Sequence, residues 1–265
     1  MAEDALIITR EDRLCILTLN RPEKRNALTP ELLKQLEDTF VDLSRTDEIR
    51  TVVIRGAGKK AFCAGYDIGV LPSGERAELA QEALVKSPLE ATFRSMIAYP
   101  YPIIAMMGGA AFGAGLELAL CADVRVAAEG IRMAMPPAKI GLVYSPEGLG
   151  RFIRCIGPGA TRELFFTGDA VSGERILRMG LADHMVPREE LQAFTLKMAR
   201  RMAANAPLAL KGIKRITHML TEFQALPPHL AREAESLMAE AWRSEDFREG
   251  RRAFLEGRPP LFTGR

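Results

Sequence analysis

One stretch of the sequence, residues 103–121, constrains the fold of this chain more than any other. It begins as the short apolar run 103–107, passes through four glycines, and continues as an apolar helical pattern that carries one acidic residue, Glu117. The first N–H groups of a helix have no partner inside the helix, so a helix that starts directly after a turn directs free donors outward. Such a helix start favours a bound anion or a negative charge that develops during a reaction. A tight packing turn with a solvated glutamate is the alternative.

The composition indicates a globular protein rather than a membrane or nucleic-acid-binding one. The chain has 265 residues, 48% hydrophobic and 26% charged, which is enough for one large domain with a sizeable core. The net charge of +2 leaves no broad basic face, which argues against nucleic acid as a partner. The acidic N-terminus has no signal pattern, and no apolar run approaches the roughly 20 residues that span a bilayer. We therefore expect a cytoplasmic protein that does not interact with membranes.

The cysteines and histidines indicate neither a disulfide framework nor a metal site. The four cysteines and three histidines lie far apart in the sequence, and none has the spacing of metal ligands. This pattern predicts reduced cysteines, as in cytosolic proteins, and no bound metal.

Hydrophobic periodicity over the first 190 residues predicts strands that alternate with helices. Two apolar runs, 6–9 and 14–19, flank a short polar segment, which predicts a hairpin. Thr29 and Pro30 have the pattern of a helix N-cap and a first helical residue. Further strands are predicted at 51–55, 103–107 and 123–128 and a helix at 88–98, with a loop and helix start at 70–87. The predicted fold class is therefore mixed α/β with right-handed crossovers.

The pattern changes after residue 157, where helical spacing dominates. Helices are predicted at 160–166, 172–179, 189–204, 208–220 and 231–243, with one last short strand within 180–187. This predicts an α/β core over residues 1–190, followed by a helical C-terminal region over residues 191–265.

A second segment, residues 61–67, is also a short apolar run that stops at a glycine. In an α/β sheet, ligands collect where neighbouring strands end, so the two glycine-broken ends form one site if their strands are adjacent. The Tyr66 N–H and an N–H near Ala114 would then converge on one oxygen atom, an arrangement suited to a carbonyl that gains negative charge. Glu117 would serve as acid or base beside that carbonyl.

Other catalytic and nucleotide-binding motifs are poorly matched. Ser145 and Ser172 have no neighbouring histidine that suggests a catalytic triad. The glycine run lacks the P-loop pattern and matches a dinucleotide-binding fingerprint poorly. A carbonyl-stabilising site therefore remains the best interpretation.

At these residues the sequence resembles the crotonase family, also called the enoyl-CoA hydratase/isomerase family. The resemblance runs over nearly the whole chain and includes five segments in the same order, 17–28, 61–68, 108–123, 139–142 and 180–187. It implies a crotonase-like β-β-α spiral core, a helical C-terminal region that makes oligomer contacts, and a homotrimer or homohexamer.

The resemblance also implies an acyl-CoA thioester as substrate and no separate cofactor. In this family two backbone amides hold the thioester oxygen, and they correspond here to Tyr66 and Ala114. A lysine or arginine beside a CoA phosphate is electrostatically reasonable, with a solvated loop as the alternative. The residues that the resemblance places along the CoA moiety are Lys24, Arg25, Ala27, Leu28, Ala64, Asp67, Ile68 and Gly69.

The carboxylates depart from the pattern of the family's hydratases. Glu117 matches the first of their two glutamates, but the second position is Pro137, which cannot transfer a proton. The position at which some related isomerases carry an aspartate is Ser145. Glu147 is the nearby carboxylate that remains, and Tyr144 offers a phenol. The candidate catalytic residues are therefore Glu117, Tyr66, Ala114 and Glu147.

This departure leaves the reaction open between hydration and double-bond isomerisation of an enoyl-CoA. Hydration usually employs two carboxylates in this family, whereas isomerisation needs one base that removes a proton and returns it elsewhere. Thioester hydrolysis and C–C bond cleavage are further crotonase reactions. A catalytically weak acyl-CoA-binding protein and a structural oligomer without a ligand are the alternatives from other classes.

Overall fold

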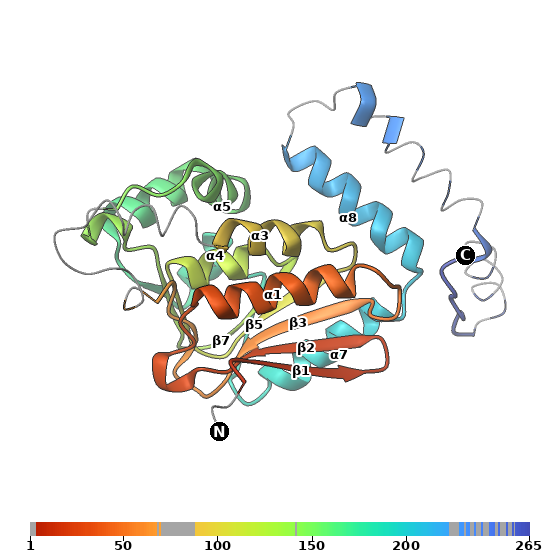
Figure 1. The fold of residues 1–265 in the computed structure, drawn as a ribbon, viewed down its shortest axis with the longest axis horizontal. Helices are drawn as coiled ribbons and strands as arrows, with labels where there is room; N and C mark the ends of the chain where they lie inside the picture. The colour runs from red at the N-terminus through yellow and green to blue at the C-terminus, as the bar shows by residue number, and fades with distance from the viewer. Residues whose placement is uncertain are drawn as a thin grey trace.

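The computed structural model describes residues 4–67, 69, 88–140 and 142–222 and, beyond them, residues 228–230, 232–233, 236, 240, 244–246, 249, 253, 256 and 258–265. The described strands form two sheets, one of six strands and one of four. Figure 1 shows the larger sheet between layers of helices, with α8 (Pro207–Glu222) leading away from it toward the C-terminus.

The six-stranded sheet begins with the predicted hairpin. Its strand order is β1-β2-β3-β5-β7-β10, in which β1 and β2 are antiparallel and the other neighbours are parallel. The bounds of these strands are Leu6–Glu11, Leu14–Leu19, Thr51–Gly56, Ile103–Met107, Val124–Ala128 and His184–Val186. The hairpin and the other strands predicted for this sheet are confirmed; most of their ends coincide with the predicted ones, and the others differ by one to four residues.

The central strands of this sheet are buried on both faces, because helices cover the sheet on two sides. All residues of β2 and β5 are buried, as expected for strands between two helical layers. α1 (Pro30–Leu43) and α3 (Leu89–Ala98) pack together over one face, and α7 (Leu191–Ala203) lies under the other (Figure 1). The Oγ1 atom of Thr29 accepts the Leu32 N–H at 3.3 Å, which confirms the predicted N-cap of α1.

The second sheet contains the two glycine-broken strand ends. Its order is β4-β6-β8-β9, with bounds Ala61–Cys63, Ala110–Phe112, Arg132–Ala134 and Val171–Ser172. The sequence pattern predicts one strand, a turn and a helix, whereas the chain leaves β5, forms β6 in this other sheet and then begins α4 (Ala114–Leu120). Gly109 permits the step between sheets, because a Cβ atom there would lie 2.6 Å from the Ala61 nitrogen.

α5 (Pro146–Thr167) is longer than the helix predicted at 160–166. Its first half begins after Ser145, whose Oγ accepts the Gly148 N–H at 3.1 Å, and its second half follows a kink at Gly157. Glycines in the first half lower its intrinsic helix propensity, which is why sequence reasoning did not assign it. The next predicted helix corresponds in part to α6 (Glu174–Arg178), and most of the predicted helix 231–243 lies outside the described residues.

A half-buried lysine holds α8 against the core. The Nζ atom of Lys214 donates to the Tyr101 carbonyl at 2.9 Å and pairs with Asp123 Oδ2 at 2.7 Å. Asp123 also accepts the Ile103 N–H at 2.7 Å, so α8 is tied to the start of β5. Within the ranges that the structure describes, no helix is long and apolar enough to cross a membrane.

Candidate active site

The two glycine-broken strand ends lie against each other. β4 and β6 are parallel neighbours, so their carboxyl ends meet at one edge of the second sheet. A Cβ atom on Gly65 would lie 2.9 Å from the Phe112 carbonyl and 3.4 Å from the Ala114 nitrogen. Gly65 also has a φ of 105°, a conformation that other residues rarely adopt, so both space and backbone require glycine here.

Two backbone amides at this edge are free to bind a ligand. Leu28 donates to the Gly65 carbonyl at 2.8 Å and accepts from the Asp67 N–H at 2.9 Å, a parallel bridge that turns the intervening Tyr66 N–H away from Leu28. Ala114 is the first residue of α4, so its N–H has no partner inside the helix. Across the described part of the chain, neither amide has a hydrogen-bond acceptor.

Glu117 lies one turn into α4 and is 1% exposed, so the alternative of a solvated glutamate is wrong. Its Oε2 atom accepts a hydrogen bond from the Tyr144 hydroxyl. Its Oε1 atom accepts from Arg151 Nε at 2.8 Å. Both carboxylate oxygens therefore have partners on the segment that leads into and forms α5.

Burial sets the protonation behaviour of this carboxyl group. Burial raises the pKa of Glu117, while the Arg151 charge and the Tyr144 and Arg151 hydrogen bonds partly oppose the rise. Burial and the neighbouring Glu117 raise the pKa of Tyr144 well above that of a free phenol, so Tyr144 stays a proton donor. A carboxyl group whose pKa is raised by burial is a stronger base in its charged form and is suited to accept and return protons.

Arg151 and Glu90 are site residues that sequence reasoning missed. The Arg151 side chain is 7% exposed, and besides Glu117 it binds both carboxylate oxygens of Glu90 on α3, one of them through Nη1 at 3.2 Å. Its guanidinium also lies 5.2 Å from the Phe93 ring centroid. The available signal was an arginine beside Phe152 on the buried face of a helix, where a charge needs a buried partner.

Among the described residues, three other positions that the sequence singled out form no hydrogen bond or ion pair with Glu117: Pro137, Ser145 and Glu147. Pro137, which occupies the second hydratase position, is buried in a 3-10 helix, Pro137–Ile140. Ser145 is the N-cap of α5, and Glu147 is exposed in the first turn of that helix. The carboxylate that the structure links to Glu117, through Arg151, is Glu90.

The predicted CoA-binding segments lie side by side. Ala64 donates to the Arg25 carbonyl at 3.0 Å, which joins the 61–67 segment to the loop that follows β2. Lys24 and Arg25 are exposed at the end of the 3-10 helix Pro22–Lys24, whereas Ala27 and Leu28 are buried. Ile68 lies outside the described residues.

Asp67 holds its own loop. It pairs with Arg21 at 3.1 Å and accepts the Gly69 N–H at 3.2 Å. Arg21 also donates to the Ala27 carbonyl at 2.6 Å, so the pair clamps both predicted CoA-binding segments together.

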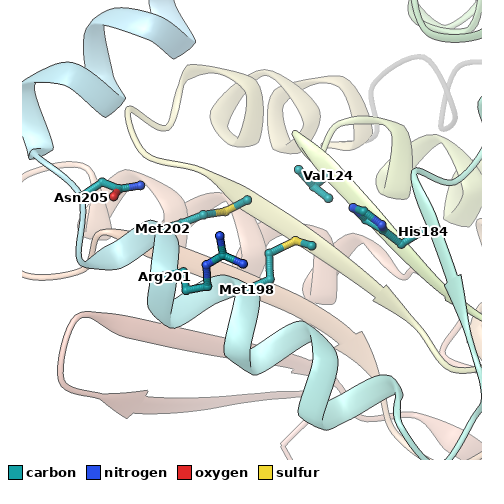
Figure 2. A pocket seen from close by; sticks show the side chains of 6 residues that line it. All are labelled: Val124, His184, Met198, Arg201, Met202 and Asn205. Atoms are coloured by element: carbon teal, nitrogen blue, oxygen red, sulfur yellow. The ribbon is translucent and has the colours of Figure 1, made fainter.

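A pocket of about 330 Å³ lies elsewhere, between β7, β10 and α7 (Figure 2). Its lining residues are Val124, His184, Met198, Arg201, Met202 and Asn205. None of them belongs to the predicted site. In the described ranges, this pocket included, there is no group of three or more histidine, cysteine, aspartate or glutamate side chains that could hold a metal ion.

Comparison with known proteins gives matches along nearly the whole chain. The family model described as "Enoyl-CoA hydratase/isomerase" matches residues 9–265. The chain is 34% identical over 254 residues to methylmalonyl-CoA decarboxylase of Escherichia coli, covering 96% of this chain and 95% of the relative. It is also 34% identical over 260 residues to 2,3-dehydroadipyl-CoA hydratase of the same organism, covering 98% of this chain and 99% of the relative.

Solved structures match equally well. An enoyl-CoA hydratase/carnithine racemase from Magnetospirillum magneticum superposes with a TM-score of 0.90 at 30% identity, covering 100% of this chain and 97% of the other. An enoyl-CoA hydratase from Bacillus anthracis gives a TM-score of 0.90 at 28% identity, covering 99% of this chain and 100% of the other.

Proposed function

The chain belongs to the enoyl-CoA hydratase/isomerase family, whose members act on acyl-CoA substrates, and we propose that it processes an acyl-CoA thioester through an enolate. The observation that carries the proposal is a pair of backbone N–H groups, those of Tyr66 and Ala114, that have no hydrogen-bond acceptor among the described residues. They belong to two chain segments that lie in contact, close to the buried carboxylate of Glu117. Two preorganised donors suit an oxygen that becomes negative, and each is worth roughly 3 kcal/mol in the transition state.

In the proposed mechanism the thioester oxygen binds between the two amides. Glu117 removes a proton from the carbon next to the thioester carbonyl, and the electron pair moves onto the oxygen. Returning the proton to a different carbon moves the double bond and completes an isomerisation. Tyr144 and Arg151 hold the Glu117 carboxylate throughout, through the hydrogen bonds described above.

Isomerisation fits the described residues better than hydration does. Hydration requires a group that deprotonates water as well as one that protonates the substrate, and Pro137 cannot supply the first. Glu147 is the candidate replacement, but its side chain is exposed and the described structure gives it no contact with Glu117. A one-base reaction at Glu117 needs no such replacement.

Decarboxylation of a 2-carboxyacyl-CoA is a second candidate, favoured by the 34% identity to methylmalonyl-CoA decarboxylase. In that reaction the bond to the carboxylate breaks, carbon dioxide leaves, and the electron pair enters the same thioester enolate. The carbon then takes one proton, which Glu117 in its protonated form would supply. This reaction also needs no activated water.

The CoA moiety is proposed to bind along the two clamped segments. Lys24 and Arg25 are exposed there and would meet a CoA phosphate, and Ala27, Leu28, Ala64, Asp67, Ile68 and Gly69 are the further residues proposed to line it. A homotrimer or homohexamer and a cytoplasmic location complete the proposal. Sedimentation of the purified chain tests the assembly, and a monomeric mass would contradict it.

A panel of thioesters tests the proposal. Crotonyl-CoA reports hydration, a 3-enoyl-CoA reports isomerisation through absorbance of the conjugated thioester, and methylmalonyl-CoA reports decarboxylation through carbon dioxide release. Turnover of any one supports the enolate mechanism and identifies the reaction. Stabilisation by CoA esters without turnover would indicate a binding protein, and no thermal shift at all would indicate a structural module.

A further inference from the structure

One arginine is shared between two glutamates in the core of the site. Arg151 binds Glu117 through Nε at 2.8 Å and Glu90 through both terminal nitrogens. The Glu117 side chain is 2% exposed, and the Glu90 side chain is 32% exposed. Three helices meet at this point, because Glu90 lies on α3, Glu117 on α4 and Arg151 on α5.

The shared arginine does not neutralise the two carboxylates equally. Despite partial burial, the hydrogen bonds and charges of Arg151 and Arg94 lower the pKa of Glu90. Burial keeps the pKa of Glu117 raised, and the Glu90 charge adds to that rise. The other titratable groups of the described chain that face Glu117 are Tyr144, which donates to it, and the buried Cys121, the C-cap residue of α4.

We propose that Glu90 is a positioning residue for the reaction: by occupying two of the three donor nitrogens of Arg151, it orients the third toward Glu117 and limits how strongly the arginine holds that carboxylate in its charged form. This inference rests on the proposed function, in which Glu117 transfers the proton. An arginine paired with Glu117 alone would stabilise the carboxylate more and make it a weaker base.

Replacing Glu90 and replacing Arg151 should move the titration of Glu117 in opposite directions. Glu90→Gln removes a negative charge near Glu117 and leaves Arg151 in place, so the Glu117 carboxyl should titrate at lower pH. Arg151→Gln removes the cation and leaves Glu90, so Glu117 should titrate at higher pH, by about one unit or more. A merely structural role predicts loss of stability in both variants but no opposite movement.

The test is a titration of Glu117 in the whole, unliganded protein. Infrared difference spectra follow the carbonyl band of the protonated carboxyl group, assigned by its disappearance in Glu117→Gln. Glu163→Gln and Arg154→Gln are the matched controls: Glu163 forms an exposed pair with Arg175, Arg154 is exposed on α5, and neither should move the band. Opposite shifts in Glu90→Gln and Arg151→Gln support the inference, and no shift or an upward shift in Glu90→Gln overturns it.

Two further measurements keep the outcomes separate. If Arg151→Gln does not fold, Arg151→Lys replaces it. Lysine loses the paired hydrogen bonds of arginine, so the Glu117 titration should shift to higher pH, but lysine keeps the positive charge, so the shift should be smaller than that expected for Arg151→Gln. The pH dependence of turnover should follow the infrared titration in Glu90→Gln. Turnover that continues while the Glu117 titration is unchanged overturns this inference alone, whereas correct titration shifts without any thioester turnover overturn the proposed function.

Discussion

At the scale of the residue, Glu117 gains its chemistry from its surroundings. In the sequence it is one acidic residue in an apolar helical pattern. In the fold it is 1% exposed, and its two carboxylate oxygens accept hydrogen bonds from Tyr144 and Arg151. Burial raises its pKa above the 4.5 of a free glutamate even with a cation beside it. The same burial that suits the Glu117 carboxyl group to proton transfer therefore makes its charged form lower the stability of the folded protein.

Replacing Glu117 by glutamine tests that cost. Because the folded pKa is raised, the stability that the neutral carboxyl contributes is fully present below the unfolded pKa and is lost as pH rises through the folded pKa. Glutamine stays neutral at every pH. The Tm of Glu117→Gln minus that of the unmodified protein should therefore increase as the pH rises from the unfolded-state pKa of Glu117 through its folded-state pKa. Each 1 kcal/mol corresponds to roughly 2–4 °C for a chain of this size. A Tm difference that stays constant from acid to neutral pH in calorimetry would contradict the shifted pKa.

At the scale of the element, the start of α4 both presents the free Ala114 N–H and packs closely against β4. Gly113 precedes the helix with φ 53° and ψ −131°, and Ala114 follows as the first helical residue. Gly115 then packs onto β4, because a Cβ atom there would meet the Cys63 carbonyl and lie 2.7 Å from its Cβ. The position of the Ala114 amide therefore depends on the glycine on either side of it.

Ala114→Pro removes the proposed oxyanion donor where a helix tolerates proline best, at its first residue. We expect kcat to fall about 10²- to 10³-fold on any thioester that the protein turns over. Glu174→Pro is the matched control, since α6 begins with a glycine of nearly the same conformation, φ 59° and ψ −147°, and Glu174 is exposed. Unchanged kcat in a folded Ala114→Pro variant would show that this amide does not bind the reacting oxygen.

Gly115→Ala tests the packing of α4 on β4. The added methyl group would collide with the Cys63 backbone, so we expect destabilisation by about 1–3 kcal/mol or failure to fold. Gly159→Ala, in the second half of α5, meets nothing within 4 Å and should be neutral or stabilising by about 0.5–1 kcal/mol. Chemical denaturation of both variants checks this, and equal stability of the two would contradict the close approach.

At the scale of the whole molecule, sequence reasoning found the parts that local patterns encode. The hairpin 6–19, the Thr29 cap and the short buried strands are visible as spacing and cap residues, and the five ordered segments indicated the family. β6 was missed because three residues carry no periodicity, and its pairing with β4 depends on how close Gly109 comes to Ala61. The Arg151–Glu90 pair was missed because it joins positions 61 residues apart on two helices, and Glu90 with Arg94 has the spacing of an ordinary surface pair.

The measurement that tests the central claim most directly is hydrogen exchange at the carbon next to the thioester carbonyl. Enolate formation is common to isomerisation and decarboxylation, so a short saturated thioester such as butyryl-CoA reports it in D₂O by mass spectrometry, whichever reaction is physiological. We predict that the protein catalyses deuterium incorporation and that Glu117→Gln slows it about 10²- to 10⁴-fold without abolishing butyryl-CoA binding. Exchange by Glu117→Gln at the rate of the unmodified protein would contradict the assignment of Glu117 as the base.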